Sequence, residues 1–370
     1  MRIAQVSPLY ESVPPKLYGG TERVVSYLTE ELVRQGHEVT LFASGDSETA
    51  AELVPISPEA LRMTERVEDD LAYYTLMLER VYAAADAFDI IHFHIAALHY
   101  PLSRLHKRPQ LTTLHGRLDL PGLVPLYEEF NDMPVVSISD SQRKPLPHGA
   151  WQGTIYHGLP LALFTPRYEP GGYLAFLGRI SPEKRVDRAI EIAKRLDMEL
   201  RIAAKINWFE REYFETKIEP LLADPKIQFL GEITQEEKDD FLGQAHALLF
   251  PIDWPEPFGL VMVEAMACGT PVVAYDRGSV REIIDEGTTG FVVNSVDEAV
   301  EAVQKAASLD RTQVRRVFEE RYSARRMTQD YVRLYERLVD SWQLAGGAGP
   351  LPRTVVEPDP TTGNPAPSIV

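Results

Sequence analysis

The chain has 370 residues, of which 44% are hydrophobic and 25% charged, and its formal net charge is −17. This length predicts two domains, each large enough to form its own hydrophobic core. The acidic balance excludes nucleic acid as the main partner, because such binding requires clustered cations, and leaves at most weak peripheral contact with a membrane. The single cysteine, Cys268, excludes an intrachain disulfide and a cysteine-based zinc site.

The apolar segments of the chain are too short for a membrane span or for a signal peptide. No apolar run approaches the length of a membrane span, so we expect no integral membrane segment. Met1 and Arg2 lead directly into IAQVSPL, which is too short for the core of a signal peptide. We therefore expect a cytoplasmic protein. The sequence does not indicate an oligomeric state.

The first half opens with a strand–helix–strand pattern. Strands are predicted at Ile3–Val6 and Glu38–Ala43, with an amphipathic helix at Arg23–Arg34 between them. Gly19 and Gly20 precede this helix, where a backbone without side chains can approach an anion closely. A plain loop-to-helix turn is the alternative, since the GxGxxG fingerprint of dinucleotide binding is missing. The remaining elements expected in this half are an irregular acidic segment at Ser44–Asp70, a helix at Leu71–Ala87, and strands at Asp89–His94, Gln110–His115, Pro134–Ser139 and Gly153–His157.

Histidines gather near two of these strands. His92 and His94 share one face of their strand, and His99 follows closely, which makes a metal site conceivable. No nearby Asp or Glu completes such a site, so we expect structural roles or contacts with a substrate instead. His115 ends the strand that begins at Gln110, and a polar group at the carboxyl end of such a strand faces the ligand cleft.

The second half begins after a linker at Tyr168–Gly172. A strand at Tyr173–Leu177 leads to Arg179 and Lys184, which flank a turn before an amphipathic helix at Val186–Leu196. Two cations beside a helix N-terminus form a good clamp for a diphosphate. The alternative is two solvated surface charges. Lys205, directly after the strand predicted at Leu200–Ala204, is a conceivable third cation of this site, and the sequence leaves its role open. The other elements expected here are strands at Leu200–Ala204 and Ile227–Gly231, and helices at Glu237–Ala245, Asp297–Ala307 and Ser323–Leu344.

A strand–loop–helix–strand unit organises the second half. It comprises a strand at Ala247–Phe250, a Pro-rich loop at Pro251–Pro257, a helix at Gly259–Cys268 and a strand at Val272–Tyr275. The loop lies at the carboxyl end of its strand, where open parallel sheets bind ligands.

Two carboxylates mark this unit, Glu256 in the loop and Glu264 in the helix, with seven residues between them. The helix start, Phe258 to Leu260 with Gly259 between, offers unpaired backbone N–H groups that suit a phosphate. Because a carboxylate accepts hydrogen bonds from vicinal hydroxyls, a ligand with hydroxyls at both ends and phosphates between them matches the unit. A nucleoside diphosphate sugar has that form. The alternative makes Glu256 a loop charge and Glu264 a residue at the edge of the core.

The segment EPFGLVMVEAMACGTPVVA closely resembles the Glu-x7-Glu motif of retaining glycosyltransferases of family 4, and the resemblance extends from Arg2 to Leu338. It implies the GT-B fold, an α/β architecture of two Rossmann-like domains facing across a cleft, with a C-terminal helix that crosses back to the first domain. We expect an N-terminal acceptor-side domain at 1–166, a donor domain at 167–322, the crossing helix at 323–345 and a Pro/Gly-rich disordered tail at 346–370.

The resemblance also implies roles for single residues. Glu256 is expected to hold hydroxyls of the donor sugar and Glu264 the ribose. His115, in a segment similar to the family's T-x-H-G, is expected to contact the sugar near its reacting carbon. The other donor-binding residues implied are Gly19, Gly20, Arg179, Lys184, Gly231, Phe258, Gly259 and Leu260, and the expected catalytic set is His115, Glu256, Arg179 and Lys184. The chain departs from the family pattern at His157, where Asn is common, at Arg185, where Gly is usual, and at Arg277-Gly278-Ser279, where Gly-Gly is usual.

The expected activity is retaining transfer of a sugar from a nucleoside diphosphate sugar, UDP in preference to GDP, to an unidentified acceptor hydroxyl. The chain contains no Asp-x-Asp, so we expect no metal and no other cofactor, with cations and helix N-termini stabilising the leaving phosphate. A nucleotide-sugar hydrolase or epimerase on the same fold, and a non-enzymatic nucleotide-sugar binding protein, are the alternatives. A paired-carboxylate hydrolase holds its two carboxylates within roughly 5–10 Å, whereas Glu256 and Glu264 suit the opposite ends of an extended ligand.

Overall fold

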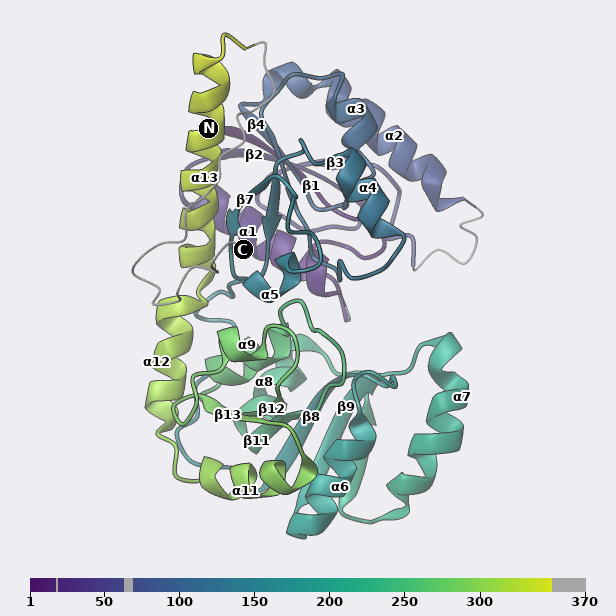
Figure 1. Cartoon of the computed structure of the whole chain (residues 1–370), viewed down its shortest axis with the longest axis vertical. Helices are drawn as coiled ribbons and strands as arrows, with labels where there is room; N and C mark the ends of the chain where they lie inside the picture. The colour runs from purple at the N-terminus through teal and green to yellow at the C-terminus, as the bar shows by residue number, and fades with distance from the viewer. Residues whose placement is uncertain (18, 63–68, 348–370) are drawn as a thin grey trace, which may run out of the picture.

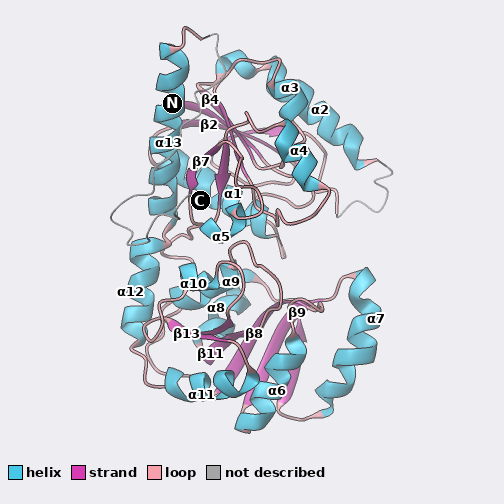
Figure 2. Ribbon diagram, viewed as in Figure 1, coloured by secondary structure: helices cyan, strands magenta, loops and turns pink. Residues whose placement is uncertain are grey.

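The computed structural model describes residues 1–17, 19–62 and 69–347. Two α/β units lie one above the other along the long axis, and the helices at the C-terminal end run along one side of both (Figure 1). Each unit contains a parallel β-sheet flanked by helices (Figure 2). The expected pair of Rossmann-like domains is therefore confirmed.

The sheet of the first domain has the strand order β3-β2-β1-β4-β5-β6-β7, with every neighbouring pair parallel. Its strands are short and largely apolar, as buried parallel strands are. Their bounds are β1 Arg2–Val6, β2 Glu38–Ala43, β3 Glu52–Pro55, β4 Ile90–Phe93, β5 Gln110–Thr113, β6 Val135–Ser137 and β7 Trp151–Thr154.

The sheet of the second domain has the order β10-β9-β8-β11-β12-β13 and is also parallel. In both sheets the order reverses beside the first strand of the domain, between β1 and β4 and between β8 and β11. Loops at such a reversal point diverge and leave a crevice for a ligand. The strand bounds are β8 Tyr173–Arg179, β9 Glu199–Lys205, β10 Ile227–Gly231, β11 Ala245–Phe250, β12 Val272–Tyr275 and β13 Gly290–Val293.

Helices connect the strands and cover the sheets (Figure 2). In the first domain they are α1 Gly20–Arg34, α2 Asp70–Ala83, the 3-10 turn η1 Ala85–Ala87, α3 Tyr100–Ser103, α4 Leu123–Glu129 and α5 Asp140–Arg143. In the second domain they are α6 Val186–Leu196, α8 Gln235–Gly243, α9 Leu260–Ala267, α10 Val280–Ile283, α11 Val296–Ala306 and α12 Arg311–Arg321, with the short turns η2 Trp208–Glu210, α7 Arg211–Tyr213, η3 Phe214–Ile218 and η4 Glu219–Ala223. The last helix is α13 Ala324–Leu344.

Helix α13 crosses back onto the first domain, as the resemblance implies. The Tyr335 hydroxyl lies 2.7 Å from His92 Nδ1, and the Tyr331 hydroxyl lies 2.8 Å from Thr113 Oγ1. Both tyrosines are buried. Because these contacts join the end of the chain to the centre of the first sheet, α13 ties the two domains together.

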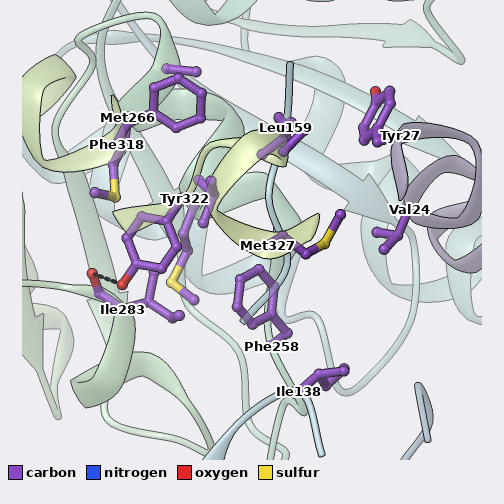
Figure 3. Close-up of a cluster of buried hydrophobic side chains, with 14 of the residues drawn as sticks. Val24, Tyr27, Ile138, Leu159, Phe258, Met266, Ile283, Phe318, Tyr322 and Met327 are labelled. Atoms are coloured by element: carbon purple, nitrogen blue, oxygen red, sulfur yellow. Dashed lines mark hydrogen bonds between the residues drawn. The ribbon is translucent and has the colours of Figure 1, made fainter. Parts of the chain in front are cut away.

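One hydrophobic cluster spans the domain junction (Figure 3). It brings Leu159, which follows the first sheet, against Met327 of α13 and Phe258 of the loop before α9. A polar link crosses the same junction, since the Glu282 carboxylate accepts hydrogen bonds from the backbone N–H groups of Asp140 and Ser141, each at 2.7 Å. Glu282 thus caps α5 from the other domain.

Several element boundaries differ from the predictions for identifiable reasons. Helix α1 begins three residues before the predicted Arg23, because Gly20 continues directly into it. Helix α8 begins at Gln235, where Thr234 and Glu237 form a capping box, and Ala245, predicted to end that helix, already lies in β11. The segment predicted to be irregular at Ser44–Asp70 contains the edge strand β3.

Other differences lie at strand ends and near the C-terminus. The strand predicted to reach His115 ends at Thr113, the one predicted to begin at Gly153 begins at Trp151, and the helix predicted at Leu71–Ala87 ends at Ala83. Helix α12 was not predicted. Residues 63–68 and the predicted tail from 348 onward lie outside the described residues.

Candidate active site

A pocket lies between the domains, at the carboxyl ends of β8, β9 and β11. The first domain contributes the start of α1, and the second contributes the loop before α9 and the first turns of that helix. The predicted residues among its lining are Gly19, Gly20, Arg179, Lys184, Glu256, Gly259, Leu260 and Glu264. Packing therefore brings together most of the donor-binding set that the sequence implied.

Helix α9 points its N-terminus and one carboxylate at this pocket. Gly259 precedes the helix with φ 78°, a left-handed conformation that glycine adopts without steric cost. Glu264 is only 4% exposed, and its Oε1 lies 2.8 Å from Nζ of Lys238 on α8. A buried carboxylate held by a single ammonium group keeps lone pairs for the hydroxyls of a ligand.

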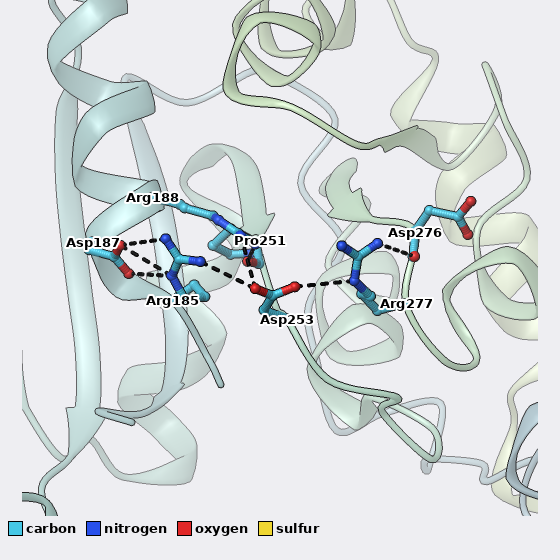
Figure 4. A network of polar contacts seen from close by, with 7 residues as sticks. All are labelled: Arg185, Asp187, Arg188, Pro251, Asp253, Asp276 and Arg277. Carbon is cyan, nitrogen blue, oxygen red and sulfur yellow. Dashed lines mark hydrogen bonds and ion pairs between the residues drawn. The ribbon is translucent and has the colours of Figure 1, made fainter. Parts of the chain in front are cut away.

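The loop that carries Glu256 is held by a network of ion pairs (Figure 4). Asp253, in the same loop, pairs with Arg188 at 3.0 Å, Arg277 at 3.2 Å and Arg185 at 3.3 Å. Arg185 occupies a left-handed position with φ 54°, which explains why glycine suits it, and its guanidinium also binds Asp187. The departure from the family pattern at Arg185 therefore adds an anchor for the loop.

The turn at Arg277-Gly278-Ser279 supports the same loop from the other side. A Cβ atom at Gly278 would lie 2.3 Å from the carbonyl oxygen of Glu256, so only glycine fits there. The N–H of Ser279 donates to that carbonyl at 3.0 Å, and its hydroxyl donates to the carbonyl of Phe258 at 2.8 Å. The single glycine kept from the usual pair is thus the one that touches the Glu256 backbone.

The two predicted phosphate ligands are already engaged with carboxylates. Lys184 forms an ion pair with Glu256, and its Nζ lies 5.0 Å from the centre of the Trp254 ring. Arg179 pairs with Glu183 at 3.1 Å and with Glu210 at 3.3 Å. These pairs orient both cations toward the pocket they line, and a phosphate entering it has to share or displace them.

Sequence reasoning missed two cations of the pocket and left the role of a third open. Lys238 was not singled out, because its place opposite Glu264 depends on how α8 packs on α9. Arg23 comes from α1 of the first domain, and its Nη1 donates to Gln235 Oε1 at 3.1 Å across the cleft. Lys205, at the end of β9, also lines the pocket and lies 3.9 Å from Glu232. The lining thus gathers cations from both domains of a chain whose net charge is −17.

His115 lies in a second pocket that adjoins the first, together with Phe258. The Gln5 amide is oriented so that its nitrogen faces the Tyr335 hydroxyl and its oxygen accepts from His94 Nε2 at 2.8 Å. His94 Nδ1 then accepts from His115 Nε2 at 2.8 Å, which leaves the lone pair on Nδ1 of His115. That Nδ1 has no hydrogen-bond partner among the described residues. Burial lowers the pKa of His115 from 6.5 to about 3, so the ring is neutral and can accept a hydrogen bond.

Comparison with known proteins identifies the family. Residues 18–151 match the sequence profile described as Glycosyltransferase Family 4, and residues 165–323 match the profile described as Glycosyl transferases group 1. The chain belongs to the GT4-type glycosyltransferases. A D-inositol 3-phosphate glycosyltransferase from Mycolicibacterium smegmatis is 24% identical over 330 residues, which cover 75% of this chain and 76% of that protein.

Solved structures agree with this family and establish the GT-B fold. A glycosyltransferase involved in avilamycin A biosynthesis is 26% identical, covers 92% of this chain and 98% of its own, and superposes with a TM-score of 0.74. An Anabaena protein solved in complex with UDP-glucose is 17% identical, with coverages of 91% and 100% and a TM-score of 0.69, and its likeness concerns the fold alone.

One prediction for this GT4-type glycosyltransferase needs adjustment. Gly231, implied as a donor-binding residue, does not itself line the pocket, whereas Glu232 and Ile233 just after it do.

The histidines that follow one another near β4 contact neighbouring side chains. His92 and His99 are both engaged by hydroxyl groups, with His99 held by Ser103 and Thr112 at 2.7 and 2.9 Å, and the described residues contain no cluster suited to a metal ion. Within those residues, no helix of the glycosyltransferase is long and apolar enough to cross a membrane.

Proposed function

We propose that this glycosyltransferase takes its sugar from a nucleoside diphosphate sugar and transfers it to an acceptor hydroxyl with retention of configuration. The observation that carries the proposal is the charge of the pocket between the domains. Its lining contains Arg23, Arg179, Lys184, Lys205 and Lys238, although the chain as a whole is strongly acidic. Such a concentration of cations beside two helix N-termini suits a diphosphate.

Different residues of the pocket are suited to different parts of the donor. Glu264, buried beside Lys238, is suited to the ribose hydroxyls, and the N-termini of α1 and α9 with Arg179 are suited to the diphosphate. Glu256, at the boundary of the two pockets, is suited to the hydroxyls of the transferred sugar. Because these fixed charges stabilise the leaving phosphate, we propose that the reaction requires no metal and no other cofactor.

In the proposed reaction the acceptor oxygen forms a bond to the anomeric carbon while the bond from that carbon to the leaving phosphate oxygen breaks. The leaving phosphate takes the proton of the acceptor hydroxyl, which releases a nucleoside diphosphate. Lys184 and Arg179 compensate the charge that develops on the phosphate. Neutral His115 accepts a hydrogen bond from a sugar hydroxyl through Nδ1 and carries no proton in the reaction.

Among donors we propose UDP-sugars ahead of GDP-sugars. This order is supported by the Anabaena protein of the same fold, which was solved in complex with UDP-glucose. A hydrolase or epimerase, and a protein that only binds nucleotide sugars, are less favoured because the two sequence profiles that match are those of glycosyltransferases.

A panel of labelled nucleotide sugars, incubated with and without a mixture of hydroxyl acceptors, separates these functions. Transfer predicts a labelled product that forms only with an acceptor, and proton NMR of the new linkage then reports whether configuration is retained. Nucleotide release that is independent of acceptor would identify a hydrolase. Binding without turnover in every combination would identify a binding protein and contradict the proposal.

A further inference from the structure

The second pocket adjoins the donor pocket at the reacting end of the proposed donor. The two share Gly19, Gly20, Glu256, Gly259 and Leu260. Residues that line the second pocket and not the donor pocket include Glu11, Glu22, Arg62, His115 and His157. A molecule in the second pocket therefore lies next to the sugar that Glu256 is proposed to hold.

The second pocket has an unusual charge for a protein that handles phosphates. Its carboxylates Glu11 and Glu22 are buried, at 9% and 6% exposure. Arg62 pairs with Glu11 through Nη1 and Oε1 at 2.9 Å. His115 and His157 add no positive charge, because burial lowers the pKa of both rings. Glu11 thus neutralises Arg62 within the pocket, and the carboxyl group of Glu22 remains without a cationic partner in this lining.

The raised pKa of the buried Glu22 carboxyl group, in the lining of a pocket, is typical of a ligand-binding site. Burial is the main cause that raises its pKa from 4.5 to about 7, and the charge of Glu11 adds to the rise. Arg62 opposes the rise only weakly. A carboxyl group that is buried at this cost at the edge of a cleft is a candidate for substrate binding.

We propose, on the basis of the function proposed above, that the second pocket is the acceptor site and that it selects a polyhydroxyl acceptor without an anionic group. Glu11 and Glu22 accept hydrogen bonds from hydroxyl or ammonium groups of the acceptor, beside the sugar that His115 and Glu256 are proposed to hold. A phosphate monoester in the same place meets carboxylates instead of free cations, and like charges in a partly desolvated pocket repel strongly.

The inference separates this chain from a relative of the same fold. The Mycolicibacterium smegmatis protein is named for a phosphorylated acceptor, D-inositol 3-phosphate. Here the pocket with Glu11 and Glu22 favours the unphosphorylated form of such a polyol, or an amino sugar whose ammonium group pairs with the Glu22 carboxylate.

Matched acceptor pairs test this directly on the full chain. The probes are myo-inositol with its 3-phosphate, glucose with glucose 6-phosphate, and glucosamine with glucosamine 6-phosphate. Transfer rates are measured with the best donor of the panel, and binding is measured by saturation-transfer NMR in the presence of the free nucleoside diphosphate. We expect at least one unphosphorylated member to react or bind about tenfold better than its phosphate. A phosphate that matches or exceeds its partner, or no binding by either member of any pair, overturns the inference.

Single substitutions test whether Glu22 causes the preference for unphosphorylated acceptors. Glu22→Gln is nearly isosteric and removes the buried charge, so we expect the preference for the unphosphorylated member to fall about tenfold. Glu31→Gln, in the same helix but outside both pockets, is the control and leaves the preference unchanged. For the wild type, the preference for glucosamine over glucose rises from pH 5 to about pH 7 as Glu22 ionises beside Glu11 and Arg62, and it falls above about pH 8 as the amino group of the sugar loses its proton. Unchanged selectivity in Glu22→Gln contradicts the assignment.

The same transfer assays distinguish this inference from the proposed function. Nucleotide release from the donor reports whether the chain uses a nucleotide sugar at all. If no donor is bound or consumed, the proposed function fails. If a donor is consumed and the phosphorylated acceptors are preferred, only the acceptor inference fails.

Discussion

Replacing Glu22 with glutamine offers a test of the electrostatics that does not depend on any substrate. Glu22 lies in the first turn of α1, is 6% exposed, and has a pKa raised to about 7, mainly by burial. Glutamine has the size of the neutral carboxyl group and, like it, one acceptor oxygen and one donor group, but it carries no charge at any pH. The substitution therefore removes one titration from the folded state and little else.

The sign and size of the effect follow from linkage. The folded pKa lies above the ordinary value of 4.5, so the folded protein favours the neutral carboxyl group. Stability from this group is fully present below pH 4.5 and is lost as the pH rises through about 7. With about 1.4 kcal/mol for each tenfold change in the protonation equilibrium, the wild type loses roughly 3 kcal/mol relative to Glu22→Gln across this range.

The measurement is the melting temperature of both proteins from pH 4.5 to pH 8, taken as the difference between them so that other titrating groups cancel. A domain of this size shifts by about 2–4 °C for each kcal/mol, so the variant gains roughly 6–12 °C over the wild type by pH 8 and little at pH 4.5. The gain should accumulate steadily between pH 4.5 and about pH 7 and level off above that range.

Glu31→Gln is the matched control in the same helix. Burial raises the pKa of Glu31, but hydrogen bonds from Arg34 and Gln35 outweigh it and leave the pKa lowered. Its charged form therefore stabilises the fold, and its removal costs stability at high pH. A difference between Glu22→Gln and wild type that is constant with pH, or one with the sign of the Glu31→Gln control, would refute the reasoning.

The donor pocket allows three further predictions. Arg179→Ala and Lys184→Ala should each weaken binding of the free nucleoside diphosphate about ten- to a hundredfold by calorimetry, because each removes a charge-assisted contact, while Lys194→Ala and the binding of unphosphorylated nucleoside stay unaffected. Glu264→Gln should raise the donor KM and weaken the free diphosphate, whereas Glu256→Gln should lower kcat and leave that affinity nearly unchanged; equal weakening by both variants contradicts the division of roles. Turnover should persist in excess chelator, and a loss that magnesium or manganese restores would contradict metal independence.

Local sequence determined the elements that carry the donor site. The strands Glu38–Ala43, Ile227–Gly231 and Val272–Tyr275 and the helix Val186–Leu196 have their predicted bounds, because apolar periodicity and terminal glycines or prolines act within a few residues. The same local logic placed Glu256 in a loop before a helix that begins after Gly259. The GT-B fold followed from the resemblance that these segments carry.

Tertiary structure alone decided which side chains meet. The ion pairs of Lys184 with Glu256 and of Lys238 with Glu264 join residues 72 and 26 positions apart, and no local pattern encodes such distances. Arg23 reaches the donor pocket only because the domains close on each other, and Glu22 acquires its raised pKa only because packing removes water around it. Periodicity specifies which face of an element is buried, but the charge of a cleft depends on which loops the assembled sheets bring to the same edge.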